Sequence, residues 1–234
     1  MKLHIFSSGR ISCRKHLLVR GAPEDEHFSV PVPFYLLEHS QGVFLFDTGQ
    51  QVPSAPLPQE AAFIPVIRDE ERAVNQLKAR GISAGDISGI ILSHRHSDHV
   101  EGLSDFPGVQ CFVRREEMDA PELADAAARD RRRWIHPQGV HDLCGDGKIL
   151  LIPTPGHTAG HQSLLLTLDN GERVLLTADA AYTEAALQDT PPAGEEELPY
   201  WTTLEKIRAL GREGVRIITG HDPESWPLLQ ALFP

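Results

Sequence analysis

The sequence contains few cysteines and no long apolar run. Its three cysteines, Cys13, Cys111 and Cys144, lie far apart and form no C-x-x-C pair. A disulfide framework is therefore not indicated, and we expect a reducing compartment. No segment approaches the length of a membrane span, and the first residues lack the apolar core of a signal peptide. These features predict a cytoplasmic protein that acts without a membrane.

Positive charge is also scarce: 22 Lys and Arg residues face 33 Asp and Glu residues, and the formal net charge is −11 at pH 7. An acidic chain is a poor partner for nucleic acid unless it carries a local basic patch. The one basic cluster, at 129–133, is interrupted by Asp130, and we expect it to be a solvated helix face. The sequence also lacks a Gly-rich phosphate loop and a nucleophile elbow, so it indicates neither phosphate binding by such a loop nor catalysis by an elbow nucleophile.

The most informative segment reads Ser-His-Arg-His-Ser-Asp-His and follows an apolar run at 90–92 that is typical of a buried strand. If the backbone stays extended after this strand, His94, His96 and Asp98 alternate onto one side and face one point. His99 is then free to turn toward a second point. The alternative is a polar loop in a chain with 12 histidines. Imidazole and carboxylate are the usual protein ligands of zinc and similar metals, so the motif predicts a metal site.

Other predicted strands also end at residues that can bind a metal. Three of them lead to His157, Asp179 and His221. Strand ends gathered at one edge of a sheet are where α/β proteins build sites, so we expect these residues to join the histidine motif. An earlier strand ends at Asp47, beside Gly49. Asp47 is either a turn former or a carboxylate that orients a ligating histidine.

These side chains are enough for two metal ions. Three imidazoles can hold one ion, two imidazoles with one or two carboxylates can hold the other, and a carboxylate can bridge both. Two ions about 3.5–4 Å apart can hold a bridging hydroxide and bind a substrate oxygen, because the pKa of bound water falls toward about 7. This chemistry suits the hydrolysis of ester-like or phosphoester bonds. Zinc is the expected metal, and iron, cobalt and manganese also suit nitrogen and oxygen ligands.

The length of the chain fits one domain over residues 1–234. Residues 50–66 are rich in proline, and we expect a loop there that covers the site. The other elements that the patterns predict are strands at 2–6, 30–37, 43–46, 109–113, 149–152, 163–168, 173–178 and 215–218, and helices at 68–80 (capped by Asp69), 115–130 and 203–212.

The order and spacing of these motifs resemble the metallo-β-lactamase superfamily from about residue 30 to residue 222. Within that superfamily the sequence is most similar to the N-acyl-homoserine lactone lactonases, which are quorum-quenching enzymes. The segments that carry the lactonase resemblance are Gly156-His157-Thr158-Ala159-Gly160-His161-Gln162-Ser163-Leu164, Leu175-Leu176-Thr177-Ala178-Asp179-Ala180-Ala181-Tyr182-Thr183, Gly9-Arg10 and Val32-Pro33-x-Tyr35-Leu36-Leu37.

The resemblance implies an αββα sandwich, in which two mixed β-sheets are flanked by helices. It also implies a role for each residue of the site. Tyr182 would face the substrate carbonyl, and Asp98 would carry a proton as well as bind metal. His161 is not a ligand in the family and is expected to be structural. The implied ligands are His94, His96 and His157 for the first metal ion, Asp98, His99 and His221 for the second, and Asp179 as the bridge.

One position departs from the lactonase pattern. These lactonases often carry a large apolar residue between the second histidine of the motif and the aspartate, where this chain has Ser97. The preference for an acyl chain is therefore open, whereas metal binding is unaffected. Phe63 and Ile64, in the proline-rich segment, are candidates to form the apolar wall of the substrate pocket instead.

The resemblance implies a dinuclear hydrolase that opens the lactone ring of N-acyl-homoserine lactones with a metal-bridging hydroxide. Its partner would be a small-molecule lactone, with neither nucleic acid nor a membrane, and the sequence allows a homodimer. Two alternatives stay open. One is another hydrolase of the same fold that acts on esters, thioesters or phosphoesters, and the other is a persulfide dioxygenase with a single iron.

Overall fold

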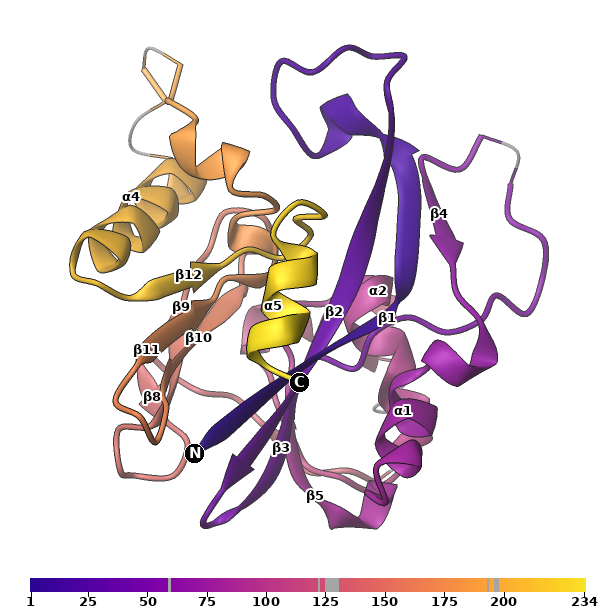
Figure 1. Cartoon of the computed structure of the whole chain (residues 1–234), viewed down its shortest axis with the longest axis vertical. Coiled ribbons are helices and arrows are strands. Elements are labelled where there is room, and N and C mark those ends of the chain that lie inside the picture. Colours follow the sequence, from indigo (N-terminus) through magenta and orange to yellow (C-terminus); the bar gives the residue numbers. More distant parts are fainter. Residues whose placement is uncertain (59, 122, 125–130, 193, 196–197) are drawn as a thin grey trace.

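The structure is a computed structural model of residues 1–234, and it describes every residue except 59, 122, 125–130, 193 and 196–197. Its strands form two sheets that face each other, with helices on the outer sides (Figure 1). No helix within the described ranges is long and apolar enough to cross a membrane.

The first sheet has seven strands and is mixed. Its β3–β5–β6–β7 neighbours are parallel and the others are antiparallel. In the order in which they lie side by side, the strands are β4 (Phe63–Val66), β1 (Lys2–Arg14), β2 (His27–His39), β3 (Gly42–Phe46), β5 (Ile87–Ile91), β6 (Cys111–Phe112) and β7 (Trp134–Ile135).

The second sheet has five strands and is also mixed, because only β11 and β12 pair in parallel. Its strands, again side by side, are β12 (Arg216–Ile218), β11 (Arg173–Leu176), β10 (Gln162–Thr167), β9 (Ile149–Pro153) and β8 (His141–Asp142). β10 and β11 form a hairpin, and Asn170-Gly171, a dipeptide typical of such turns, lies between them.

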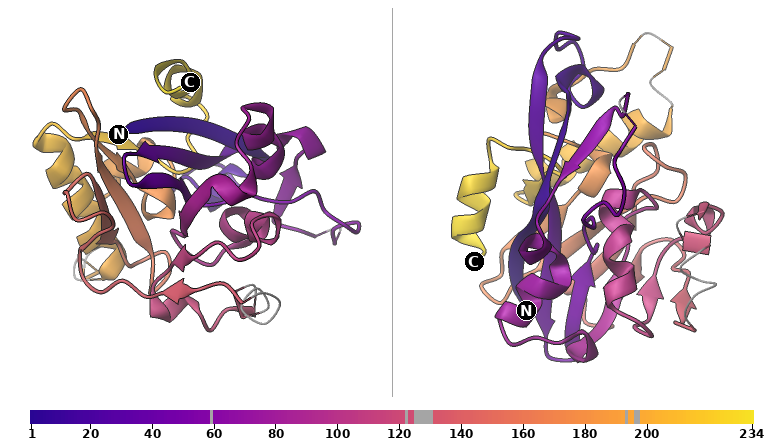
Figure 2. Two further views of the ribbon diagram at one scale, coloured as in Figure 1. Left: turned by 90° about the horizontal axis from the view of Figure 1, so that it is seen from below. Right: turned by 90° about the vertical axis from the view of Figure 1, so that its right-hand side faces the viewer.

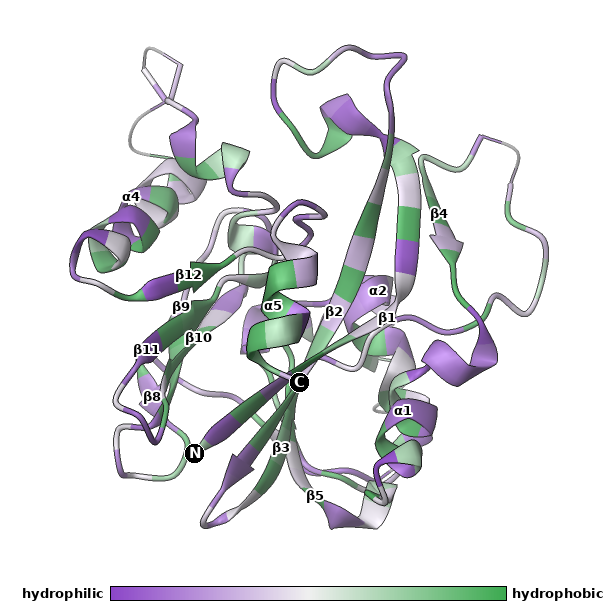
Figure 3. Ribbon diagram, viewed as in Figure 1, coloured by the Kyte–Doolittle hydropathy of each residue, from purple (hydrophilic) through white to green (hydrophobic). Residues whose placement is uncertain are grey.

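Alternation along the strands builds the layers. Tyr35 and Leu37 of β2 belong to the cluster between the two sheets, which they share with Leu164 and Leu166 of β10. The residues between them face outward: Phe34 and Leu36 pack under the helices of the first sheet. Because side chains of a strand alternate between its faces, one apolar run can serve two cores. Both sheets are accordingly rich in hydrophobic residues (Figure 3).

Helices cover the two outer faces. α1 contributes Leu77 to the core outside the first sheet, and α4 contributes Ile207 to the core outside the second. Two views at right angles show these layers (Figure 2). The αββα sandwich is therefore confirmed. The helices whose bounds lie in the described part of the chain are α1 (Ala73–Ala79), α2 (Ser97–Val100), α4 (Pro199–Arg212) and α5 (Trp226–Leu232), and the short 3₁₀ helices there are η1 (Lys15–Leu17), η2 (Asp69–Glu71), η3 (Ala84–Asp86), η4 (Glu101–Asp105), η5 (Arg115–Glu117), η6 (Ala178–Ala180) and η7 (Ala185–Gln188).

Three predicted elements need correction. The segment 50–66 is not loop throughout, because its last residues form β4 at the edge of the first sheet, where Pro65 is tolerated. α1 begins after Arg72, and Asp69 opens the separate turn η2. The predicted helix at 115–130 is not continuous: its first residues form the short η5, residues 121, 123 and 124 are α-helical, and residues 122 and 125–130 lie outside the described residues. Within the basic cluster Arg132 is buried and donates to the Leu103 carbonyl, so it is no solvated face.

Candidate metal centre

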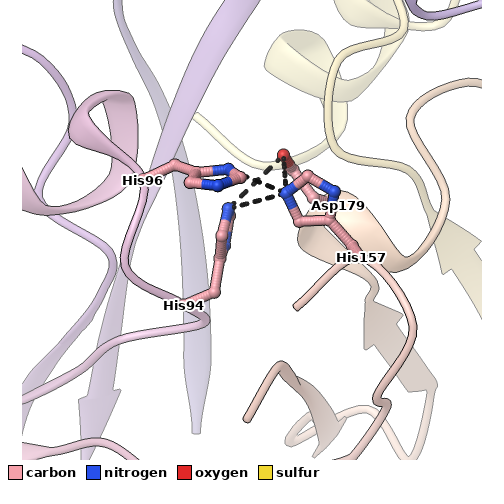
Figure 4. A group of neighbouring side chains, drawn as sticks. All are labelled: His94, His96, His157 and Asp179. Carbon is pink, nitrogen blue, oxygen red and sulfur yellow. Dashed lines mark hydrogen bonds and ion pairs between the residues drawn. The ribbon is translucent and has the colours of Figure 1, made fainter. Parts of the chain in front are cut away.

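The seven predicted ligands come together at the edge of the sandwich, in two neighbouring groups. Within each group the potential ligand atoms all lie within 4.8 Å of one another. Figure 4 shows the first group, in which three imidazoles and a carboxylate point toward one another. The first group is His94, His96, His157 and Asp179, and the second is Asp98, His99 and His221.

The local backbone explains how one short motif serves both groups. His94 follows β5 in extended chain, but the helix α2 begins at Ser97 with His96 as its N-cap. The extended alternation therefore ends before Asp98, which lies in the first turn of the helix. Simple alternation predicts that Asp98 faces the same point as His94 and His96, and this prediction is wrong. The helical turn directs it, together with His99, into the second group.

Asp179 links the two groups. It is carried by η6, directly after β11, and its two oxygens face opposite ways. Oδ2 lies 3.2 Å from Nε2 of His157 and 3.5 Å from Nε2 of His94. Oδ1 lies 3.1 Å from Nε2 of His99 and 3.0 Å from Nε2 of His221. One carboxylate oxygen is thus available to each group, which is the geometry of a bridging ligand.

The donor atoms of the first group suit a cation. Nε2 of His157 lies 3.1 Å from Nε2 of His94 and 2.9 Å from Nδ1 of His96. Three imidazole nitrogens therefore converge on one small space, where protons cannot satisfy all their lone pairs. In the second group, Nε2 of His99 is buried and faces carboxylate oxygens of Asp179 and Asp98 at 3.1 and 3.4 Å. Both groups therefore fit divalent metal ions bound by nitrogen and oxygen.

Asp47 orients His99 of the second group by a hydrogen bond on the side of the ring away from the centre. Its Oδ2 accepts from Nδ1 of His99 at 2.8 Å, and its two oxygens accept from the Ser93 backbone and hydroxyl at 2.7 and 2.8 Å. The bond to Nδ1 leaves Nε2 of His99 facing the centre. Asp47 has a φ of 58°, in the left-handed region, and Ala178 next to the bridging carboxylate has 46°. Such backbone strain is typical of functional sites.

The pKa values follow the arrangement of charges. Burial lowers the pKa of His94 well below its ordinary value, and it also lowers the pKa of His157. Burial opposes protonation of His99 as well, but the carboxylates of Asp98 and Asp179 outweigh it and raise the pKa of His99 well above its ordinary value. Against its own burial, Asp179 has its pKa lowered well below the usual range by His99 and His221. The carboxylates thus favour positive charge at this point, whether a proton or a metal ion carries it.

Tyr182 lies at the border of the first group. Its hydroxyl is 3.0 Å from Nδ1 of His157, the nitrogen that faces away from the centre. Burial raises the pKa of Tyr182, and the charge of Asp179 raises it further. The phenol therefore stays protonated and can donate a hydrogen bond. His161 is also buried, bonds to the Thr154 hydroxyl at 2.8 Å and belongs to neither ligand group.

A cavity of about 480 Å³ adjoins both ligand groups. Phe63 lines it, but Ile64 does not. Of the two candidates for the apolar wall, only Phe63 contributes to the cavity, because neighbouring residues of β4 point to opposite faces of the sheet. Ser97 is also in the wall. The lining residues are Ile11, Leu18, Val30, Gln50, Leu57, Phe63, Pro65, His96, Ser97, Asp98, Glu101, His157, Asp179, Tyr182 and His221.

Sequence reasoning missed part of this wall. Ile11, Leu18 and Val30 belong to β1, to the turn after it and to β2, and they form an apolar cluster against which Tyr182 packs. Their apolar character was visible, but nothing in the local sequence places the far end of this hairpin beside the histidine motif. Ser93 was missed too, although its position between the strand and His94 offers a signal for a supporting role.

A helix-flanked double sheet with histidine and aspartate groups at its edge defines a known class of metal-dependent proteins. The sequence model of the metallo-beta-lactamase superfamily matches residues 29–221, and the chain belongs to this superfamily. It is similar to the N-acyl homoserine lactonase AttM of Azorhizobium caulinodans, with 32% identity over 97% of this chain and 95% of the relative. The N-acyl homoserine lactonase AiiA of Bacillus thuringiensis subsp. kurstaki is 31% identical, over 95% of this chain and 94% of the relative.

Solved structures agree with these relatives. An N-acyl homoserine lactone hydrolase with the product N-hexanoyl-L-homoserine at its catalytic metal centre superposes with a TM-score of 0.83, at 28% identity, over 97% of this chain and 95% of that one. A mutant of B. thuringiensis AiiA with N-decanoyl-L-homoserine at its active site gives the same TM-score, identity and coverage. The resemblance to the lactonases is therefore confirmed.

Proposed function

We propose that the protein hydrolyses the lactone ring of N-acyl-homoserine lactones. The observation that carries the proposal is the carboxylate of Asp179, which offers one oxygen to each of two ligand groups beside an apolar-walled cavity. The activity of the relatives AttM and AiiA supports this assignment, as do acyl-homoserine products at the active sites of structures with 28% identity.

The centre would hold two divalent metal ions, with zinc as the expected metal. His94, His96 and His157 would bind one ion, and Asp98, His99 and His221 the other, with Asp179 shared. When bound, such ions polarise an ester carbonyl and lower the pKa of water enough to make it a nucleophile at neutral pH.

The residues of the chain orient the substrate and move protons. In the reaction water adds to the ring carbonyl carbon, the ring C–O bond breaks, and the products are a carboxylate and a hydroxyl on one molecule. Tyr182 would donate a hydrogen bond to the carbonyl oxygen as negative charge develops there. Burial works against ionisation of Asp98, but His99 outweighs it and lowers the pKa of Asp98. Asp98 is thus ionised and can take a proton from water and pass it to the leaving ring oxygen.

The cavity suits an acylated lactone. Its polar side is formed by the ligand groups and Tyr182, and its apolar side includes Leu18, Leu57 and Phe63. A small polar ring and a hydrocarbon chain would each contact matching surface. The persulfide dioxygenase alternative requires a single iron, whereas here two ligand groups share one carboxylate.

The proposal also includes a cytoplasmic location and assembly as a homodimer. A cytoplasmic location is supported by the three cysteines, none of which forms a disulfide. A homodimer is compatible with the exposed apolar residues Ile64 and Val66 on the edge strand β4. Light scattering on the purified protein would give the assembly state directly.

The test is metal content measured together with lactone turnover. Elemental analysis of the purified protein should give two ions per chain, and a pH-stat assay should show acid release from acyl-homoserine lactones. Asp179→Asn should lose metal and most of the activity. Asp142→Asn is the matched control, because Asp142 also accepts hydrogen bonds but is the last residue of β8 and lies outside both ligand groups. A protein that holds one ion, or that opens no acyl lactone when both ions are bound, would refute the proposal.

A further inference from the structure

The side chain of Glu117, at the end of η5, is completely buried. It belongs to neither ligand group. Its two oxygens are nevertheless engaged separately: Oε2 accepts from the backbone N–H of Arg95 at 3.0 Å, and Oε1 accepts from the backbone N–H of Gly160 at 2.7 Å. Burying a carboxylate is costly unless it is well hydrogen-bonded, so these two bonds explain how the fold accommodates Glu117.

The two donors belong to the two loops that carry the first ligand group. Arg95 lies between His94 and His96, and Gly160 follows His157 in the turn after β9. The first loop leaves the seven-stranded sheet and the second leaves the five-stranded sheet. A single carboxylate therefore joins, through the backbone, the segments that bring three imidazoles together from opposite halves of the sandwich.

Gly160 is matched to this contact. A Cβ atom at position 160 would lie 2.8 Å from Oε1 of Glu117 and 2.9 Å from its Cγ. Any other residue there would push the carboxylate away from the backbone. The approach of Glu117 thus requires glycine at this point of the loop.

The second ligand group has other supports. His99 is held by Asp47 through Nδ1 at 2.8 Å, and His221 contacts the Pro31 carbonyl through Nδ1 at 2.8 Å. Neither contact involves Glu117. Changes at Glu117 should therefore affect the two groups unequally.

We infer that Glu117 is a positioning residue. It sets the spacing between the His94–His96 loop and the His157 loop, and in this way it increases the metal affinity of the first site. This inference rests on the proposed dinuclear centre. Residues that orient metal ligands typically contribute about 10- to 100-fold to metal affinity, and we expect an effect of that size confined to the first site.

The experiment is a metal titration of the apoprotein. Glu117→Gln keeps the shape of the side chain but presents an NH₂ group to one of the two backbone N–H donors. Co²⁺ is added to chelator-treated protein, and the two binding steps are followed by visible absorption. The steps are assigned with His96→Gln, which damages the first site, and His221→Gln, which damages the second. Asp142→Asn is the matched control for losing a carboxylate that accepts backbone hydrogen bonds.

We expect Glu117→Gln to weaken the first-site step about 10- to 100-fold while the second-site step and the circular dichroism of the apoprotein stay unchanged. Gly160→Ala keeps the carboxylate but displaces it, and it should weaken the same step. It also provides the test if Glu117→Gln does not fold. Equal weakening of both steps, or no change in either variant, would overturn the inference while wild-type metal binding and lactone turnover remain intact. If the wild-type protein binds only one ion, the proposed function fails, and the inference fails with it.

Discussion

Tyr182 Oη and His157 Nδ1 lie 3.0 Å apart, so the tyrosine expected to act on the substrate is tied to a residue expected to bind metal. If His157 presents Nε2 to the centre, its Nδ1 carries the hydrogen and donates it to the tyrosine oxygen. The hydroxyl hydrogen of Tyr182 is then free for the substrate. One contact thus fixes both the histidine tautomer and the direction of the phenol.

Tyr182→Phe should lower kcat for an acyl-homoserine lactone about 10-fold, less than for the loss of a sole oxyanion donor, because the metal ions carry most of the charge. Metal content should be unchanged, since the histidine keeps its Nε2. The assay compares wild type and variant at equal metal occupancy. Full lactone turnover by the variant would show that the phenol gives the reaction no hydrogen bond.

Asp47→Asn should weaken metal binding at the second site about 10- to 100-fold, because an amide cannot replace all the acceptor contacts to Ser93 and His99. Asparagine tolerates the left-handed backbone of this position, so added strain is not the cause of the effect. Competition with a chromophoric chelator measures the affinity. Unchanged affinity would mean that His99 is oriented without Asp47.

Phe63→Ala should reduce the preference for a decanoyl over a butanoyl lactone by about 5-fold, the equivalent of about 1 kcal/mol of apolar contact with the longer chain. Ile64→Ala is the matched control, because Ile64 is exposed to a similar degree (44% against 46%) but does not line the cavity. The ratio of kcat/KM for the two substrates is the measurement. Equal ratios in the two variants would exclude Phe63 from the acyl-chain wall.

His161 should make the protein sensitive to acid. Burial lowers the pKa of His161 to about 3, whereas an unfolded chain binds this proton near pH 6.5. Between those values only the unfolded state is protonated, so this residue reduces stability as the pH falls from about 6.5, by up to about 1.4 kcal/mol per pH unit. His161→Asn should be less stable than wild type at pH 7, and the gap should shrink toward pH 5.

Urea unfolding of the two proteins at pH 7, 6 and 5 measures that gap. Titrating groups far from position 161 affect both proteins alike and cancel in the difference. A gap that does not change with pH would mean that His161 becomes protonated in the folded protein.

Sequence patterns predicted most of the strands and most of the site because both depend on short-range signals, whereas the arrangement of the strands in two sheets was implied by the family resemblance. Strands buried on both faces are visible as continuous apolar runs, such as the one from Phe34 to Leu37, and each ligand candidate follows an apolar run. The failures have identifiable causes. β4 was hidden by Pro65, which an edge strand tolerates. Simple alternation grouped Asp98 with His94 and His96 because it took no account of the helix α2, which begins one residue before Asp98. The family resemblance had instead grouped Asp98 with His99 and His221, as the structure does.

Contacts between distant segments could not be predicted at all. Glu117 meets Arg95 and Gly160 across 22 and 43 residues of sequence. Nothing near Glu117 distinguishes it from the adjacent Glu116 except its burial in the folded chain. The apolar wall from β1 and β2 belongs to the same category, because it depends on where a long hairpin ends in space.

Every strand of the seven-stranded sheet precedes residue 136, and every strand of the five-stranded sheet follows residue 140, throughout the part of the chain that the structure describes. The protein could therefore be divided in this connection into two pieces, each with an intact sheet. The first piece would carry His94, His96, Asp98 and His99, the second would carry His157, Asp179 and His221, and neither would hold a complete ligand group. The hydrophobic cluster between the two sheets would drive the reassociation of the pieces. Metal ions would tighten it further, because each ligand group takes residues from both pieces.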